Sequence, residues 1–436
     1  MKLETAGIPT ISVHTHVFAR LVKSVAQANG MPTVRQVFVP QPIVGKSAAE
    51  LRAYIEGQDP VHKRTFIQGV LEGLTGGLTE EDRKGVSFDR STPRLLEPDT
   101  EANLHRLFME QHWTDCMPVV LPTEERVAAM LRGTSQPPDK IVGQLNPASF
   151  RELWAFDVEK VAVNAVLAGA KPEYLPVILA LAASGLTARS SSTTSWSTIS
   201  VVNGPIRNEI GMSAGIGAMG PWNHANTAIG RAYCLLSQNL QGGSVPDETY
   251  MGTLGNWYSY SATFPENEER SPWEPFHVQH GFKAEDSTVS VFLGGWYTQA
   301  GFGPRDTWEQ KFRHCLAACE PFIGPLIVLD PLVARGFVER GMDTKQKLIR
   351  WCAENARLTA REYWDNQWSQ TLLRPHAVAG IEPYASRLKA DPDEQIRMFE
   401  EDQIHVVVTG GETQGAWKMI SGMLRGKGTI SVDEWR

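Results

Sequence analysis

The segment that decides the fold spans residues 199–240 and reads ISVVNGPIRNEIGMSAGIGAMGPWNHANTAIGRAYCLLSQNL. Its first four residues are a short apolar run, which is typical of a buried strand. Residues 225–240 place apolar side chains at helical spacing, which predicts a helix. Between the strand and the helix lies a loop rich in glycine and in polar side chains. Ligands of α/β proteins bind where such loops leave the carboxyl ends of strands, so the segment predicts an α/β fold with a ligand pocket.

The glycine-rich stretch of residues 203–231 carries six glycines among amide, guanidinium and carboxylate side chains. Glycine lets the backbone approach a ligand closely and tolerates positive φ angles. We therefore expect a small polar substrate to bind here. Arg207 and Arg231 are expected to clamp a carboxylate, because a guanidinium group matches its geometry. The residues of this stretch that are expected to contact the substrate are Asn203, Arg207, Asn223, Asn226 and Arg231.

The overall composition is that of an ordinary globular protein. The chain has 436 residues, a length that predicts two or three domains, with 42% hydrophobic and 21% charged residues. The net charge of −7 gives no electrostatic case for binding nucleic acid. No apolar run approaches the roughly 20 residues that a membrane span needs. The N-terminus lacks the pattern of a signal peptide, so we expect a cytoplasmic protein without a membrane segment.

The chain is expected to divide into three parts. Residues 1–57 read as strand, helix and strand, which predicts a Rossmann-like half-domain. Residues 58–111 are polar and predict a linker or arm. Residues 112–436 predict the main α/β domain, with a parallel or mixed sheet and the glycine-rich pocket. Because a single strand–helix–strand unit leaves open sheet edges, either the main sheet or another chain should complete it.

Local patterns predict further elements of the main domain. The run CMPVVL at residues 116–121 predicts a short strand, and residues 172–183 predict a buried helix that opens with a proline. Residues 404–409 predict a strand, which is followed by two glycines and by an expected helix near Ala416. This would be a second unit of strand, glycine turn and helix, and a second possible ligand loop.

A second dense polar segment, ENEERSPWEPFH at residues 266–277, is expected to close the pocket. Trp273 and His277 are expected to contact the substrate. Glu268 is expected to transfer protons, together with Glu209 and His224 of the glycine-rich stretch, because carboxylates and imidazoles are common acid–base groups. The alternative is that this segment is a solvated charged loop.

The sequence leaves the cofactor unknown. A metal site is possible, and its candidate ligands are His224, His277 and Glu268. The pattern G-x-G-x-x-G at residues 215–220 lacks the context of a nucleotide site, because Pro221 follows directly where a helix should begin. Cys116 is the best candidate for a catalytic thiol, although a buried structural cysteine is the more common case.

The N-terminal sequence GIPTISVHTHVFARLVKSVAQANGMP, followed by VFVPQPIVGK, resembles the second half of the bacterial UGSC domain. That family is named for a selenocysteine- or cysteine-Gly-Ser-Cys motif upstream of such a segment. The stretches at residues 158–185, 201–232 and 264–278 resemble the larger domain that accompanies it. No Cys-Gly-Ser-Cys motif occurs in this chain. The resemblance implies either a second subunit that carries the motif or a branch that does without the thiol chemistry.

These observations lead us to expect an enzyme, or the large subunit of one, that acts on a small polar metabolite that bears a carboxylate. If a partner supplies a thiol pair, thiol-dependent cleavage of a carbon–heteroatom bond is the expected chemistry. Without one, we expect a cofactor-free or metal-dependent lyase or hydrolase. The alternative from another class is a non-catalytic scaffold or a metabolite-binding subunit. In each case we expect an oligomer.

Overall fold

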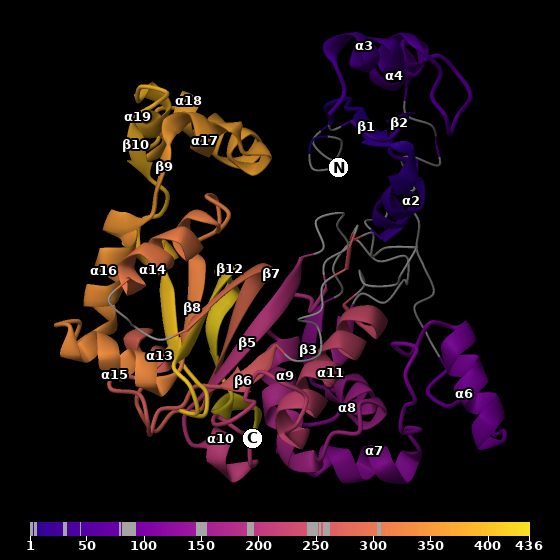
Figure 1. Ribbon diagram of the computed structural model, residues 1–436. Helices are drawn as coiled ribbons and strands as arrows, with labels where there is room; N and C mark the ends of the chain where they lie inside the picture. The colour runs from indigo at the N-terminus through magenta and orange to yellow at the C-terminus, as the bar shows by residue number, and fades with distance from the viewer. Residues whose placement is uncertain are drawn as a thin grey trace.

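The computed structural model describes residues 7–28, 33–43, 45–77, 93–144, 155–189, 196–241, 262–302 and 307–436, together with a few single residues between these ranges (Figure 1). Helices and strands are mixed along the chain, so the α/β class predicted from the sequence is confirmed. The strands are β1 (Ser12–Thr15), β2 (Gln36–Val39), β3 (Ile141–Gln144), β4 (Ala155–Asp157), β5 (Ser197–Asn203), β6 (Thr263–Pro265), β7 (Thr288–Phe302), β8 (Pro325–Leu329), β9 (Arg357–Thr359), β10 (Gln395–Arg397), β11 (His405–Val408) and β12 (Ala416–Ser431).

The helices are mostly short and lie between the strands. They are α2 (Ala19–Ala28), α3 (Ala48–Glu56), α4 (Phe66–Thr75), α6 (Glu101–Glu110), α7 (Glu124–Leu131), α8 (Val158–Leu167), α9 (Leu175–Ala182), α10 (Ile206–Glu209), α11 (His224–Asn239), α13 (Phe276–Gln279), α14 (Trp308–Ala317), α15 (Pro331–Glu339), α16 (Lys345–Asn355), α17 (Ala360–Asp365), α18 (Arg374–Val378) and α19 (Tyr384–Lys389). Single helical turns are η1 (His16–Phe18), η2 (Pro172–Tyr174), η3 (Ser369–Leu373), η4 (Glu401–Gln403) and η5 (Asp433–Trp435).

Six strands form the main sheet, in the order β11-β8-β12-β7-β5-β6. The pairs β5–β6 and β8–β11 are parallel and the other pairs are antiparallel, so the sheet is mixed, as the sequence predicted. The two long strands β7 and β12 belong to both halves of the sheet. Residues 288–294 of β7 pair with β5, and residues 417–421 of β12 pair with β8.

The sheet curls until its two outer strands meet at their carboxyl ends. The amide of Asn267, just after β6, donates to the carbonyl of Val408 in β11 at 2.7 Å. The hydroxyl of Thr409 donates to the carbonyl of Pro265 at 2.9 Å. The carboxyl end of β5 lies beside them, because the amide of Glu266 donates to the carbonyl of Val202 at 3.0 Å. The ends of three strands thus form one corner of the curled sheet.

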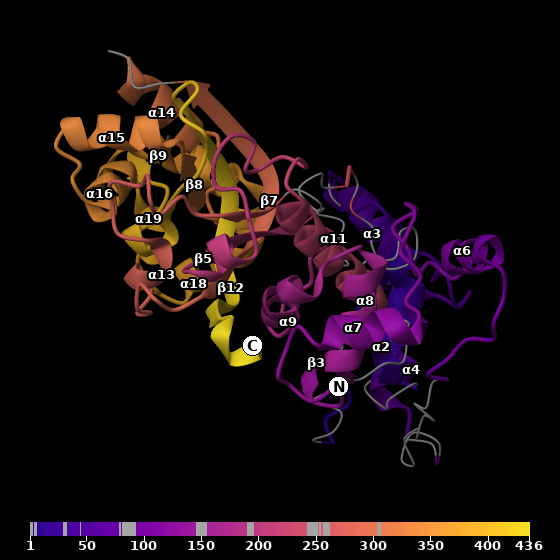
Figure 2. The same ribbon diagram turned by 90° about the horizontal axis from the view of Figure 1, so that it is seen from below.

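Alternating side chains of the sheet face two different cores. One set fills the inside of the curl, with residues from all six strands, such as Val201, Phe292 and Val407. The other set packs against helices outside it: α8, α9 and α11 cover one side, and α14, α15 and α16 cover the other (Figures 1 and 2). Burial of both faces explains why these strands are almost continuously apolar.

Two predicted elements of the main domain are wrong. Residues 116–121 form no strand. The segment near Ala416 is not a helix but the start of β12, so the second unit of strand, glycine turn and helix does not exist. Here β7 and β8 hydrogen-bond to both sides of the chain, and this tertiary pairing outweighs local helical preference. By contrast, the predicted buried helix is present as η2 and α9, with every residue of α9 buried.

The N-terminal unit is a parallel pair, β1 and β2, with α2 between the strands along the chain. Helix α4 packs on β2, and it does so closely, because a Cβ placed on Gly69 would lie 2.7 Å from the side chain of Val37. Helix α4 lies within the segment 58–111 for which a linker was predicted. The strand–helix–strand order agrees with the sequence, whereas a Rossmann-like half-domain stays a prediction.

Candidate functional site

Two loops meet over the corner of the curled sheet. The amide of Gly410, after β11, donates to the carbonyl of Ala214 in the glycine-rich stretch at 2.9 Å. The side-chain amide of Asn267 donates to that same carbonyl at 3.2 Å. Gly411 has no room for a side chain, because a Cβ there would lie 2.2 Å from Ile216. Gly411 therefore allows the two loops to pack closely against each other.

Beneath these loops lies a group of interacting polar and charged side chains, which we call the corner cluster. Its members are Asn203, Arg207, Glu266, Glu268, His277 and Lys345. Asn203 ends β5, Arg207 lies on α10, His277 lies on α13, and Lys345 is the first residue of α16. Glu266 and Glu268 lie in the loop after β6. The curl of the sheet brings this loop and the four elements together.

Glu266 is the most deeply buried carboxylate of the corner cluster. It receives 2.7 Å hydrogen bonds from the ammonium group of Lys345, from the side-chain amide of Asn203 and from the backbone amide of Phe276. The side chains of Glu266 and Lys345 are both 0% exposed. Because a buried carboxylate must be paired and hydrogen-bonded to be tolerated, this arrangement gives Glu266 a structural role.

Glu268 is held in place by three groups. Its Oε1 atom accepts hydrogen bonds from the backbone amide of Gly204 at 2.8 Å and from the side-chain amide of Asn203 at 2.9 Å. Its Oε2 atom lies 3.0 Å from Nη2 of Arg207. Glu268 retains a side-chain exposure of 13%, so the corner cluster reaches solvent there.

Arg207 and Arg231, which were predicted to clamp a carboxylate, bond to separate sets of protein acceptors in this structure. All N–H groups of Arg207 are engaged: Nε donates to the carbonyl of Gly204, Nη1 to the carbonyl of Glu266 and to Glu269, and Nη2 to Glu268 and Glu269. No donor remains for a substrate, since a guanidinium has five N–H groups. The same hydrogen bonds lower the pKa of Glu269 to about 2.

Arg231 is engaged elsewhere. Its Nε atom donates to the buried carboxylate of Asp115 at 2.9 Å, and its Nη2 atom donates to the carbonyl of Pro118 at 2.7 Å. These bonds tie α11 to the segment before α7, which includes the exposed Cys116. Cys116 therefore lies beside the Arg231–Asp115 ion pair, and the structure records no contact of its thiol with the corner cluster among the described residues.

His277 lies beside Glu268, with 4.0 Å between its Nδ1 atom and Oε1 of Glu268. Its side chain is 0% exposed, and neither ring nitrogen has a hydrogen-bond partner among the described residues. Buried polar atoms are rarely left unsatisfied, and those that are often occupy sites for water or ligands. Of the predicted catalytic and binding residues, Glu268 and His277 form the pair whose geometry is most compatible with proton transfer.

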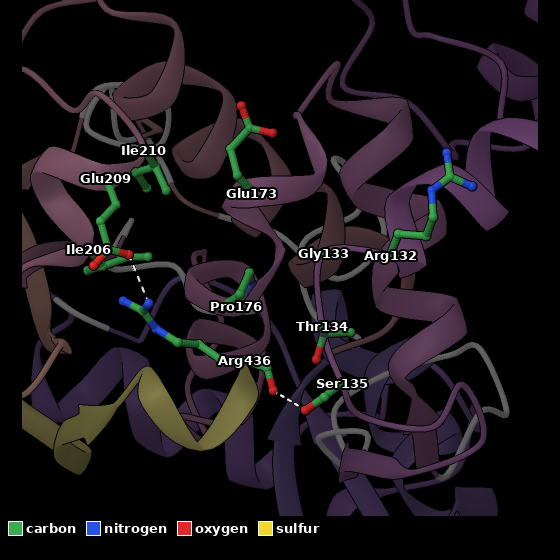
Figure 3. Close-up of a pocket in the computed structure, with 10 residues that line it drawn as sticks. All are labelled: Arg132, Gly133, Thr134, Ser135, Glu173, Pro176, Ile206, Glu209, Ile210 and Arg436. Carbon is green, nitrogen blue, oxygen red and sulfur yellow. Dashed lines mark hydrogen bonds and ion pairs between the residues drawn. The ribbon is translucent and has the colours of Figure 1, made fainter.

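The other predicted catalytic residues lie outside the corner cluster. The carboxylate of Glu209 pairs with Arg436 at 2.8 Å, and both residues line a surface hollow of about 480 Å³, shown in Figure 3. The Nδ1 atom of His224 lies 3.2 Å from the hydroxyl of Tyr174. Within the described parts of the chain, no group of three or more His, Cys, Asp or Glu side chains is arranged to hold a metal, so His224, His277 and Glu268 do not assemble.

Three predicted substrate contacts are engaged in local structure instead. Asn223 caps α11 by accepting from the amide of Asn226 at 3.0 Å. The side chain of Asn226 bonds to the loop at Ser213 and Ala218. The indole of Trp273 donates to the carbonyl of Met342 at 3.0 Å and packs in the core beneath α14, α15 and α16.

Two residues of this region were not predicted from the sequence: Lys345, and Thr288, which lies opposite Asn203 in the sheet. Lys345 follows a Thr that caps its helix, and a lysine there resembles an ordinary surface residue. One sequence signal was available for Lys345. A cation in the first turn of a helix is unfavourable beside the positive end of the helix dipole, so its presence there suggests a specific anionic partner.

The fold and the corner cluster together define a mixed α/β protein with a buried group of charged and polar side chains at one end of a curled sheet. Residues 1–65 match the family model of the UGSC family, so the resemblance inferred from the N-terminal sequence is confirmed over that segment. The comparison with curated proteins gave no match. Within the described residues, no helix is both long enough and apolar enough to cross a membrane.

Proposed function

We propose that this protein is an enzyme, or the large subunit of one, that acts on a small polar metabolite by acid–base chemistry at the corner cluster. The observation that supports this most directly is the pair of unpartnered, buried ring nitrogens of His277 beside the carboxylate of Glu268. A positioned imidazole with a neighbouring carboxylate is a common proton-transfer unit. We place this activity in the cytoplasm.

The contacts within the corner cluster suggest a separate role for each of its residues. His277 accepts a proton from the bound substrate at one ring nitrogen, and Glu268 stabilises the resulting imidazolium from 4.0 Å. Arg207 and the amide of Gly204 are positioning groups, because they fix both oxygens of Glu268 and do not face the substrate. In a lyase, the bond to the leaving group breaks and His277 returns the proton to that group. In a hydrolase, His277 takes the proton from the water that attacks the substrate and passes it to the leaving group.

Substitution of Glu268 by glutamine tests this proposal. We expect the variant to fold and to lose turnover by about 10²–10⁴-fold, because the amide cannot stabilise the imidazolium. The assay incubates the protein with pooled small polar metabolites and follows depletion by mass spectrometry. The matched control is Glu209→Gln, an exposed glutamate outside the corner cluster.

Retention of full turnover by Glu268→Gln would refute the acid–base role. Absence of any turnover by the native protein, alone and with its co-purifying partners, would favour the scaffold or binding subunit instead.

The N-terminal unit supports a second candidate, a thiol-dependent enzyme with a partner subunit. Residues 1–65 match the UGSC family, and within the described residues β1 and β2 pair only with each other. Parallel sheets normally contain more strands, with both faces covered, so a partner strand would stabilise this pair. We expect purification from the native host to recover a second chain with a Cys-Gly-Ser-Cys motif. A homo-oligomer that is fully active by itself would contradict this candidate.

A further inference from the structure

We propose that the corner cluster recognises a hydroxyl group of its ligand rather than a carboxylate, an inference that rests on the proposed function. Four polar side-chain atoms in this region have no hydrogen-bond partner among the described residues: Oδ1 of Asn203, Oγ1 of Thr288, and Nδ1 and Nε2 of His277. All three side chains are 0% exposed. Leaving such atoms unsatisfied is unfavourable, so a bound group should pair with them.

The side chains that carry these atoms lie next to one another. Asn203 and Thr288 are directly opposite in the antiparallel pair of β5 and β7 and therefore share one face of the sheet. That face is the inner one, because it continues the row of Val201 and Phe292 inside the curl. His277 joins them through Glu268, whose Oε1 atom lies 2.9 Å from Nδ2 of Asn203 and 4.0 Å from Nδ1 of His277.

The orientation of the Asn203 amide is fixed by its neighbours. Its Nδ2 atom donates to the carboxylates of Glu266 and Glu268, at 2.7 and 2.9 Å. The reverse orientation would place the amide oxygen against two carboxylates, so the unpartnered atom is the oxygen. Asn203 thus offers an acceptor and no free donor to a ligand.

The other unpartnered atoms define what the ligand must supply. A neutral imidazole has one donor and one acceptor nitrogen, and a threonine hydroxyl can do either. With Asn203 as an obligatory acceptor, the ligand group must both donate and accept hydrogen bonds. A hydroxyl does both, whereas a carboxylate only accepts and an ammonium only donates.

The local charges also disfavour a carboxylate. The nearest cations are already used, since Lys345 is paired with Glu266 and every N–H of Arg207 is bonded. A substrate carboxylate would enter beside Glu266 and Glu268, while the Arg207 and Lys345 side chains of the corner cluster are already paired, which is costly in a buried site. The corner cluster is therefore suited to an uncharged polyol or hydroxy compound.

Three probes with the same three-carbon skeleton test this inference: propane-1,2-diol, which carries hydroxyl groups, propanoate, which carries only a carboxylate, and propan-1-amine, which carries only an ammonium group. The measurement is NMR of ¹⁵N-labelled histidine side chains, with the His277 signals assigned from their loss in His277→Gln. We expect the diol to shift the His277 signals at lower concentration than propanoate or propan-1-amine does. The His224 signals are the internal control.

Thr288→Val provides the matched variant, because valine has the shape of threonine without the hydroxyl. We expect its melting temperature to equal that of the native protein, since the hydroxyl has no protein partner to lose. We expect its affinity for the diol to fall about tenfold, the equivalent of one hydrogen bond.

Two results would overturn the inference: no shift of His277 at saturating diol, which would mean that the site holds only water, or a response to propanoate as strong as that to the diol. These outcomes can be distinguished from a failure of the proposed function. Loss of turnover in Glu268→Gln without diol binding would refute the hydroxyl inference alone, and diol binding with full turnover in Glu268→Gln would refute the acid–base role alone.

Discussion

Replacement of Lys345 by methionine is expected to lower the free energy of unfolding by about 3–5 kcal/mol. Methionine preserves most of the volume of the side chain but removes the ammonium group that lies 2.7 Å from Oε1 of Glu266. Both side chains are fully buried, so Glu266 would keep an unpaired charge in the interior or take up a proton. The measurement is urea denaturation followed by tryptophan fluorescence.

The same helix offers a matched control. Lys347 lies two residues further along α16 and pairs with Asp343 at 2.9 Å, but these side chains are 54% and 61% exposed. Lys347→Met should change the free energy of unfolding by about 0–1 kcal/mol, because water screens exposed ion pairs. The double variant Lys345→Met/Glu266→Gln should lose less free energy of unfolding than the sum of the losses in the two single variants. A Lys345→Met variant as mild as Lys347→Met would show that the buried pair does not stabilise the corner cluster.

Substitution of His277 by glutamine is expected to reduce turnover by about 10²–10⁴-fold. Glutamine can fill the site and form hydrogen bonds, but it cannot accept a proton at neutral pH. Because neither ring nitrogen of His277 has a partner among the described residues, the substitution breaks no hydrogen bond of the protein itself. We therefore expect the fold and the melting temperature to be retained while turnover is lost.

The sequence predicted the parts of the fold that local patterns encode. The strand at residues 199–202, the following helix and the buried helix at residues 172–183 are present because their apolar spacing is local information. Strand β12 was mistaken for a helix because its conformation depends on two neighbouring strands that are distant in sequence. The curl of the sheet, which creates the corner cluster, depends on those same long-range pairings.

Residues of the candidate site could be predicted where they lie close to one another in the sequence. Glu268 and His277 come from one short polar segment, and Asn203 and Arg207 come from the glycine-rich stretch, so composition was enough to select them. Composition could not show that Arg207 would be fully engaged by neighbouring acceptors rather than free for a substrate. Lys345 lies 79 residues after Glu266 in the sequence. Local sequence patterns do not reveal a contact between residues so far apart.

The most direct test of the account compares the turnover of His277→Gln with that of His280→Gln on the reaction identified by metabolite depletion. His280 lies three residues away on the same turn and stacks on Phe276, with 4.2 Å between ring centroids. We predict that His277→Gln loses about 10²–10⁴-fold in turnover while His280→Gln stays close to the native rate. Equal rates in the two variants, with both proteins folded, would contradict the assignment of proton transfer to the corner cluster.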